Sequence, residues 1–176
     1  MKKTFLKNKK NIQFLIIGLG LIGGSVAKRL SKNGFEILAI EKNKSHLNHA
    51  KKLKILNGGL EKIDSTKKLF VIVALPPKIL LRNFDKYLNL FHKADFVTDC
   101  TSVKGSLLNK IKKNKLESKF ILSHPIAGSE KSGFLNSNED LFRDKISIIS
   151  KHKGLATSTL QKCLSLIHIS EPTRPY

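Results

Sequence analysis

Cysteine, arginine and long apolar runs are all scarce in this sequence, and each shortage excludes a class of protein. The two cysteines, Cys100 and Cys163, show no Cys-x-x-Cys spacing, so they provide neither a disulfide framework nor a zinc site, and we expect no bound metal. They favour a reducing compartment, and we expect the cytoplasm. The N-terminal apolar run, residues 14–24, is too short to cross a membrane, so we expect no membrane partner.

Arginine is rare even though the chain is strongly basic. Of 33 basic residues only four are arginine and 29 are lysine, against 13 acidic residues, which gives a formal net charge of +20. Nucleic-acid sites depend on arginine forks and stacking aromatic rings, whereas the lysines here are scattered along the chain. An AT-rich genome, whose codons favour lysine and asparagine, explains the excess more simply. We therefore expect no nucleic-acid partner.

The N-terminus admits two interpretations. A basic stretch, MKKTFLKNKK, precedes the apolar run, and secretory signal peptides show the same order. The run also contains three glycines, Gly18, Gly20 and Gly23, at the spacing of a phosphate-binding loop. We therefore interpret residues 1–11 as a basic lead-in and residues 12–18 as a strand that enters such a loop.

Short apolar runs alternate with amphipathic stretches, which predicts alternating strands and helices. The runs are continuously apolar, as in parallel strands that are covered on both faces. We predict a doubly wound α/β domain of the Rossmann type over residues 12–150, with a short turn-and-helix insertion before the last strand. The expected strands are 12–18, 35–41, 68–77, 95–100, 119–124 and 145–150, and the expected helices are 23–34, 44–55, 78–93 and 103–115.

The glycine loop has the sequence context of a dinucleotide site. Gly18-x-Gly20-x-x-Gly23 directly follows a strand and opens a helix, and Glu41 ends the next strand. In such a loop the first glycine permits the tight turn, the second lets the pyrophosphate approach, and the third allows close packing of helix on strand. The N-terminal N–H groups of the helix then face the phosphates.

Glu41 predicts which dinucleotide binds. Its carboxylate would accept hydrogen bonds from the ribose hydroxyls on the adenine side and would repel a 2′-phosphate. Lys42 softens this preference, because its cation could pair with a phosphate. We expect NAD, with NADP as the less favoured cofactor. The expected cofactor-binding residues are Gly18, Gly20, Leu21, Ile22, Gly23, Glu41, Leu75, Pro76 and Thr101.

Polar residues follow the later strands at the same edge of the sheet. Ligands of open parallel sheets bind outside the carboxyl ends of the strands, and Ser102 and His124 follow neighbouring strands. Pro125 excludes His124 from helical backbone and holds it extended. A neutral imidazole there can accept a proton at cellular pH, and Ser102 could orient it. A loop histidine that only caps a backbone group explains the pattern equally well.

Four segments, GLGLIGGS, VALPP, TDCTSVKG and HPIAGSEKSGF, resemble those of the prephenate/arogenate dehydrogenase family of tyrosine biosynthesis, in the same order over about residues 12–150. The resemblance implies an NAD-dependent oxidative decarboxylation of prephenate to 4-hydroxyphenylpyruvate. It implies that His124 is the catalytic residue at the ring hydroxyl of the substrate and that Ser102 positions it. It also implies that Ser123 and Glu130 belong to the polar network around the substrate.

The resemblance further implies a C-terminal helical domain, which dimerises and supplies an arginine for a substrate carboxylate. We expect residues 151–163 to begin the connection to that domain. Residues 164–174 match the translation of a transposase sequencing adapter, so we expect residues 164–176 to be adapter-derived and the natural protein to continue. A homodimer is expected for that longer protein, and little or no turnover for this fragment.

Other interpretations stay open at this stage. Arogenate is an alternative substrate. A Rossmann oxidoreductase of the β-hydroxyacid type would place a catalytic lysine on a later helix, and a stand-alone NAD-binding regulatory module would need no catalytic loop. His46 and His49 lie three apart on an expected helix but lack a third metal ligand. Cys100 lacks an adjacent base, so we expect a small buried residue there rather than a nucleophile.

Overall fold

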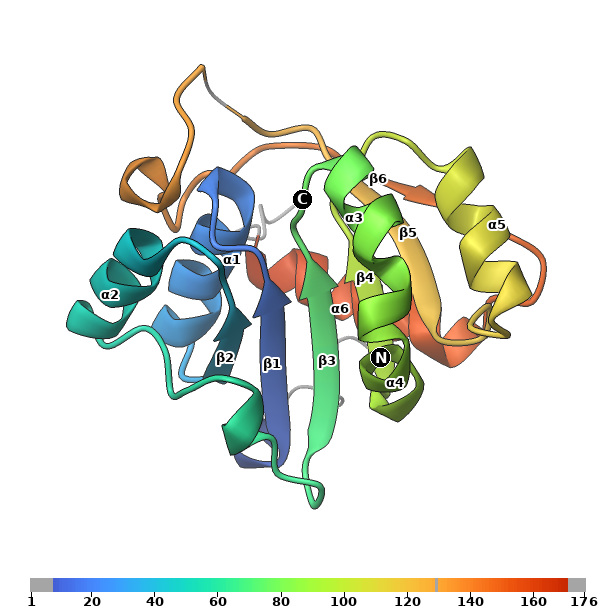
Figure 1. The fold of residues 1–176 in the computed structure, drawn as a ribbon, viewed down its shortest axis with the longest axis horizontal. Helices are drawn as coiled ribbons and strands as arrows, with labels where there is room; N and C mark the ends of the chain where they lie inside the picture. Colours follow the sequence, from blue (N-terminus) through green and yellow to red (C-terminus); the bar gives the residue numbers. More distant parts are fainter. Residues whose placement is uncertain (1–7, 129, 171–176) are drawn as a thin grey trace, which may run out of the picture.

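A six-stranded sheet forms the centre of the molecule in the computed structural model, which describes residues 8–128 and 130–170 (Figure 1). The strand order is β2-β1-β3-β4-β5-β6. The first five strands are parallel, and β6 pairs with β5 in the antiparallel sense. The strands are β1 Ile12–Ile17, β2 Glu36–Ile40, β3 Lys68–Val73, β4 Phe96–Asp99, β5 Phe120–Pro125 and β6 Ser147–Ser150.

Helices cover both faces of this sheet. They are α1 Leu21–Lys32, α2 Lys44–Lys52, α3 Pro77–Asn83, α4 Leu88–Lys93, α5 Gly105–Lys113 and α6 Thr157–Ser170, with 3₁₀ turns η1 Lys9–Asn11, η2 Leu60–Lys62, η3 Phe84–Tyr87 and η4 Phe134–Asn136. Figure 1 shows α3 and α4 in front of the sheet and α6 behind it. The doubly wound α/β fold predicted from the apolar runs is therefore confirmed.

Strand β1 shows why the core has two halves. All six of its residues are buried, and successive side chains point to opposite faces. Phe14 and Ile16 belong to the apolar cluster that includes residues of α1, α2 and α6. Leu15 and Ile17 belong to the cluster on the other face, which includes residues of α3, α4 and α5. A strand buried on both sides needs a largely apolar sequence, and the one polar residue of β1, Gln13, donates hydrogen bonds to Glu36 Oε1 and Lys62 O.

Strand β6 departs from the expected parallel arrangement. Residues 126–146 connect β5 to β6, and their described part, 126–128 and 130–146, contains the short turn η4 and no helix that crosses the length of the sheet. The chain therefore returns to the sheet at the edge where it left, and the next strand has to run in the opposite direction.

The helix expected over residues 78–93 is divided into α3, η3 and α4. The Asn83 side chain donates from Nδ2 to Ile79 O at 2.8 Å, and a side chain that bonds to the backbone in this way competes with the helical ladder. The backbone leaves the helical region at Asn83 (φ −104°, ψ 6°) and again at Tyr87 (φ −100°, ψ 1°). Periodicity alone did not show these two interruptions.

Residues 126–146, called the return loop below, extend from β5 to helices α1 and α2 before the chain enters β6. Figure 1 shows them running from β5 to η4, beside α1 and α2, and back to β6. Phe134 lies so close to Gly24 that a Cβ on the glycine would be 2.8 Å from Phe134 Cδ2. The Asn138 N–H donates to Ser25 Oγ at 2.9 Å. The return loop is therefore fixed to the first turns of α1.

Helix α6 continues past residue 163, where we expected the adapter-derived tail to begin. Cys163 and Leu166 are both buried in the same apolar cluster as α1. Thr159 donates from Oγ1 to Ser118 O at 2.7 Å, which ties the start of the helix to the turn before β5. The adapter origin of residues 164–176 stays a prediction. Residues 1–7 of the expected lead-in and residues 171–176 of the tail lie outside the described residues.

Candidate active site

The strand order brings the expected site segments into one row along the carboxyl edge of the sheet. Because β1 lies between β2 and β3, the strand order reverses there, and such a switch point is where open α/β sheets bind ligands. Backbone hydrogen bonds tie successive segments together: Gly18 N–H to Ile40 O at 2.8 Å, Ala74 N–H to Ile17 O at 2.8 Å and Cys100 N–H to Val73 O at 3.0 Å. In order, the row contains Glu41, the glycine loop, Leu75 and Pro76, residues 100–102, and His124.

Gly18 and Gly23 are required by the packing of the loop. Gly18 has φ +95°, a left-handed conformation that favours glycine, and a Cβ there would lie 2.7 Å from Ala74 O and 2.9 Å from Leu75 Cδ2. A Cβ on Gly23 would lie 1.9 Å from Gly18 O. The first and third glycines therefore bring α1 against the ends of β1 and β3, as their spacing predicted.

Gly20 has a different environment. It is the N-cap residue of α1, and a Cβ placed on it would meet no atom within 4 Å. Leu21 and Ile22 form the first turn of the helix and are partly exposed. Open space therefore adjoins a helix N-terminus, whose free N–H groups and positive dipole end attract phosphate. These residues fit a pyrophosphate group.

Glu41 follows β2 directly and reaches the glycine loop. Its Oε2 accepts a hydrogen bond from the Leu19 N–H at 2.5 Å, and its Oε1 accepts one from the Asn43 N–H at 2.7 Å. The side chain is half-buried, so it stands at the rim of the loop rather than inside the core. A carboxylate in this position fits ribose hydroxyls.

Asp99 organises the turn after β4. It is fully buried, and its Oδ2 accepts hydrogen bonds from the Thr101 N–H at 2.9 Å, from Thr101 Oγ1 at 2.5 Å and from Lys104 Nζ at 2.7 Å. The Thr101 side chain is thus bound inside the turn. Ser102 lies exposed in the same turn, and none of the hydrogen bonds of the described residues joins it to His124.

His124 stands at the carboxyl end of β5 beside a cavity. Its Nδ1 lies 3.3 Å from Cys100 O, at the long end of the hydrogen-bond range. A carbonyl oxygen only accepts, so a hydrogen bond at this contact needs the ring proton on Nδ1, and in the neutral imidazole Nε2 is then the acceptor. Glu130 is exposed in the return loop. The cavity has a volume of about 320 Å³ and is lined by His124, Pro125, Ile126, Ala127, Gly128 and Lys145.

Ser123 lies behind the site rather than beside the cavity. Only 8% of its surface is exposed, and its Oγ donates to Asp99 O at 2.6 Å and lies 2.9 Å from Thr98 Oγ1. Sequence analysis placed it near the substrate but gave no role to Asp99 or Lys104. An acidic residue that ends a buried apolar strand requires a partner, and that rule could have identified this pair.

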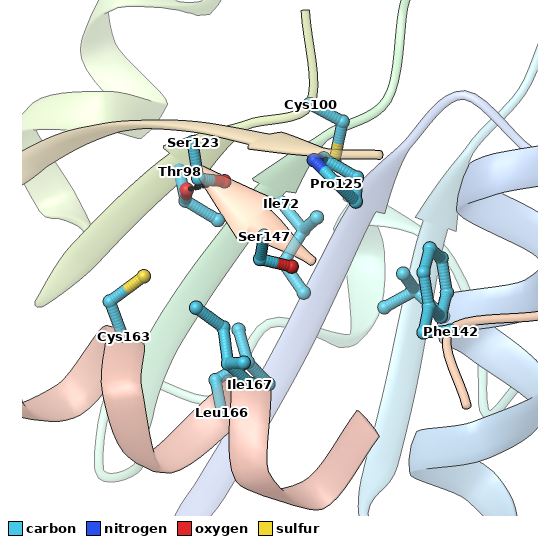
Figure 2. A pocket seen from close by; sticks show the side chains of 11 residues that line it. Ile72, Thr98, Cys100, Ser123, Pro125, Phe142, Ser147, Cys163, Leu166 and Ile167 are labelled. Atoms are coloured by element: carbon cyan, nitrogen blue, oxygen red, sulfur yellow. Dashed lines mark hydrogen bonds between the residues drawn. The ribbon is translucent and has the colours of Figure 1, made fainter. Parts of the chain in front are cut away.

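A smaller pocket of about 50 Å³ lies between the sheet and α6, and both cysteines line it (Figure 2). Although Cys100 is partly exposed, burial of its thiol raises the pKa to about 12, and the Asp99 charge adds to the effect. Burial likewise raises the pKa of Cys163 to about 12. Both side chains are therefore neutral thiols at physiological pH.

We expect both thiols to resist alkylation in the folded protein. The thiolate is the reactive form, and a pKa raised from 9.0 to about 12 lowers its fraction near pH 8 about a thousandfold. Treatment with iodoacetamide at pH 8, followed by mass spectrometry, should leave both cysteines unmodified in the native chain and modify both in denaturant. Rapid native alkylation of Cys100 would contradict its assignment as an unreactive residue.

Neither a metal site nor a membrane span is found in residues 8–128 and 130–170. No group of three or more His, Cys, Asp or Glu side chains there is arranged to hold a metal ion. His49 Nδ1 lies 2.9 Å from Ser45 O within α2. No helix in that part of the chain is long and apolar enough to cross a membrane.

Comparison with known proteins shows the family. Residues 26–169 match the family model described as prephenate dehydrogenase, nucleotide-binding domain. The chain belongs to the prephenate dehydrogenase family. The match begins inside α1, after the glycine loop.

Relatives within the prephenate dehydrogenase family are longer than this chain. The prephenate dehydrogenase of Lactococcus lactis subsp. cremoris is 31% identical over 147 residues, and that of Bacillus subtilis is 30% identical over 169 residues. The alignments cover 79% and 91% of this chain but only 41% and 45% of those proteins. A crystal structure of prephenate dehydrogenase from A. aeolicus, in complex with hydroxyphenyl propionate and NAD+, is similar with a TM-score of 0.77 and 29% identity, covering 90% of this chain and 57% of that one.

Proposed function

We propose that this chain is the nucleotide-binding part of an NAD-dependent prephenate dehydrogenase, which converts prephenate to 4-hydroxyphenylpyruvate in tyrosine biosynthesis. The observation that carries the proposal is the position of His124 at one end of the row that begins with Glu41 and includes the glycine loop. A catalytic base and a dinucleotide site would then share one edge of the sheet.

Different residues of the row would bind different parts of the cofactor. Glu41 would hold the adenine-side ribose. Gly20, Leu21 and Ile22 would hold the pyrophosphate at the start of α1, where space is open. Leu75, Pro76 and Thr101, after β3 and β4, would border the remaining half. When bound, NAD supplies the hydride acceptor for the oxidation.

His124 would handle the proton of the substrate hydroxyl. With Nδ1 directed at Cys100 O, its Nε2 is free to take that proton while hydride leaves the same ring carbon. The bond to the ring carboxylate then breaks, its electrons complete the aromatic ring, and carbon dioxide departs. The proton returns to the phenol oxygen of the product. Ser102 would position the hydroxyl and the imidazole, and Glu130 would belong to the polar network at the entrance.

Dimerisation and part of the substrate binding would require a longer protein than this chain. We propose that a helical domain beyond this chain dimerises and supplies an arginine for a substrate carboxylate. This chain alone would then bind NAD without measurable turnover. Arogenate differs from prephenate only in the side chain, so both substrates should be compared in the assay of the longer protein.

Glu41 is expected to select NAD. Hydrogen bonds to a charged acceptor contribute about 1.5–3 kcal/mol, so Glu41→Gln should weaken NAD binding by roughly tenfold or more and leave NADP binding unchanged or improved. Calorimetric titration of both cofactors into the chain measures this. Glutamine retains an oxygen that can accept from the Leu19 N–H, so the loop should keep its shape.

Glu61→Gln is the matched control. It removes the same charge from an exposed residue of η2, away from the carboxyl edge. It should leave both affinities at the wild-type values. Equal NAD affinity in the wild type and in Glu41→Gln would remove Glu41 from the cofactor site, and a chain that binds neither cofactor would overturn the proposed function.

A further inference from the structure

Every polar group of Ser123, the residue before His124, is bound by residues of or just after β4. The Ser123 N–H donates to Asp99 Oδ1 at 3.1 Å. Its carbonyl oxygen accepts from Lys104 Nζ at 2.6 Å. Its hydroxyl donates to Asp99 O at 2.6 Å. The backbone that carries His124 is therefore fixed immediately before the imidazole.

Asp99 also fixes the group that the imidazole faces. Its Oδ2 accepts from the Thr101 N–H at 2.9 Å, which closes a tight turn around Cys100. The Cys100 N–H donates to Val73 O at 3.0 Å, so the residue is held from both sides. The Cys100 carbonyl is thus directed at His124 Nδ1.

Lys104 joins these two parts. Its Nζ contacts both Asp99 Oδ2 at 2.7 Å and Ser123 O at 2.6 Å. The Asp99 side chain is 0% exposed and that of Lys104 only 19%, so both charges are largely removed from water. A buried ion pair is weak support for stability, because desolvation offsets its attraction. The role of the Asp99–Lys104 pair is therefore sought in the groups that it holds in place, and not in its contribution to stability.

We propose that Asp99 and Lys104 are positioning residues that hold His124 in the Nδ1-protonated tautomer, with Nε2 open to the cavity. The ion pair fixes Ser123 on one side and the Cys100 carbonyl on the other, and the imidazole between them has one orientation that satisfies Nδ1. The catalytic use of that tautomer rests on the proposed function. The tautomer itself does not, because cofactor and substrate take no part in it.

The first test needs no substitution. In the ¹⁵N-labelled chain, long-range proton–nitrogen correlation spectra distinguish a protonated from an unprotonated ring nitrogen in each of the six histidines. His124→Gln assigns the signal of interest by its disappearance. We expect the Nδ1-protonated form of His124 to exceed the other neutral tautomer by roughly tenfold, the ratio that one ordinary hydrogen bond produces. An excess of the Nε2-protonated form would overturn the proposal.

The second test removes Lys104. In Lys104→Met the Ser123 carbonyl loses its donor and Asp99 loses its cation, so the tautomer ratio should fall severalfold toward equal populations. Lys110→Met is the matched control, because it breaks the more exposed pair with Asp85 at 3.1 Å and should leave the ratio unchanged. Circular dichroism establishes that both variants are folded. A folded Lys104→Met with the wild-type ratio, or an equal shift in both variants, would overturn the role of Lys104. If Lys104→Met does not fold, the tautomer ratio of His124 in the wild-type chain alone tests the proposal.

These results separate the inference from the proposed function. Calorimetry with NAD on the same samples tests the cofactor site, and the spectra test the positioning pair. NAD binding with an Nε2-protonated His124 would reject only the inference. An Nδ1-protonated His124 in a chain that binds no NAD would reject only the proposed function.

Discussion

Replacing Gly23 with alanine is expected to destabilise the fold strongly. The added Cβ would lie 1.9 Å from Gly18 O and 3.0 Å from Ala74 Cβ, and the first of these is backbone that cannot move without displacing the end of β1. Overpacking a well-packed interior costs about 1–3 kcal/mol of stability. A clash with backbone, which cannot change rotamer, should cost about 3 kcal/mol or more. The thermal midpoint should fall by roughly 10 °C or more, measured by circular dichroism.

Gly20→Ala is the matched control within the same loop. Its Cβ would meet nothing within 4 Å, so the thermal midpoint should stay within about 2 °C of wild type. The same methyl group would occupy the space proposed for the pyrophosphate, so NAD affinity should fall by roughly tenfold or more. A stable Gly23→Ala chain would contradict the packing role of Gly23. Unchanged NAD affinity in Gly20→Ala would contradict the assignment of the open space.

The second large effect concerns His124 in the full-length protein. Loss of a general base lowers the rate typically 10²–10⁴-fold, and His124→Asn should lower kcat by about that factor. Asparagine can bond to Cys100 O but cannot take a proton, so the affinity for NAD should change little. Initial rates of NADH formation with prephenate and with arogenate measure the first effect, and calorimetry measures the second.

His49→Asn is the control for that experiment. His49 is exposed on α2, and its Nδ1 faces Ser45 O within the same helix. The substitution should leave kcat at the wild-type value. A His124→Asn enzyme with more than about a tenth of the wild-type kcat would show that proton transfer to this imidazole is not the catalytic step.

Several features were predictable because a local rule determines them. The largely apolar sequence of β1 predicts a strand buried on both faces, and the spacing of Gly18, Gly20 and Gly23 predicts a tight turn into a helix. Glu41 was placed correctly at the end of β2 because strand length limits where the next loop begins. Pro125 predicts an extended His124 by a local steric rule, and His124 does lie in β5.

Other features depend on contacts between distant parts of the chain. The direction of β6 follows from the path of the return loop, which no local pattern encodes. The Ser123 hydroxyl has partners 24 and 25 residues earlier, so its inward orientation appears only once β4 and β5 are paired. The ion pair of Asp99 with Lys104 is local, but Lys104 also donates to the Ser123 carbonyl, and that contact exists only once β4 and β5 are paired.

The attachment of the return loop to α1 has a consequence for the order in which the chain folds. The Asn138–Ser25 hydrogen bond spans 113 residues, and Phe134 covers Gly24 from about the same distance in sequence. Contacts of such long range form late, because closing the loop between them carries an entropic cost before any contact is gained. During synthesis the first turns of α1 stay uncovered until residue 138 has left the ribosome. The first turns of α1 are therefore made early in synthesis but are covered late, first by the return loop and then by α6.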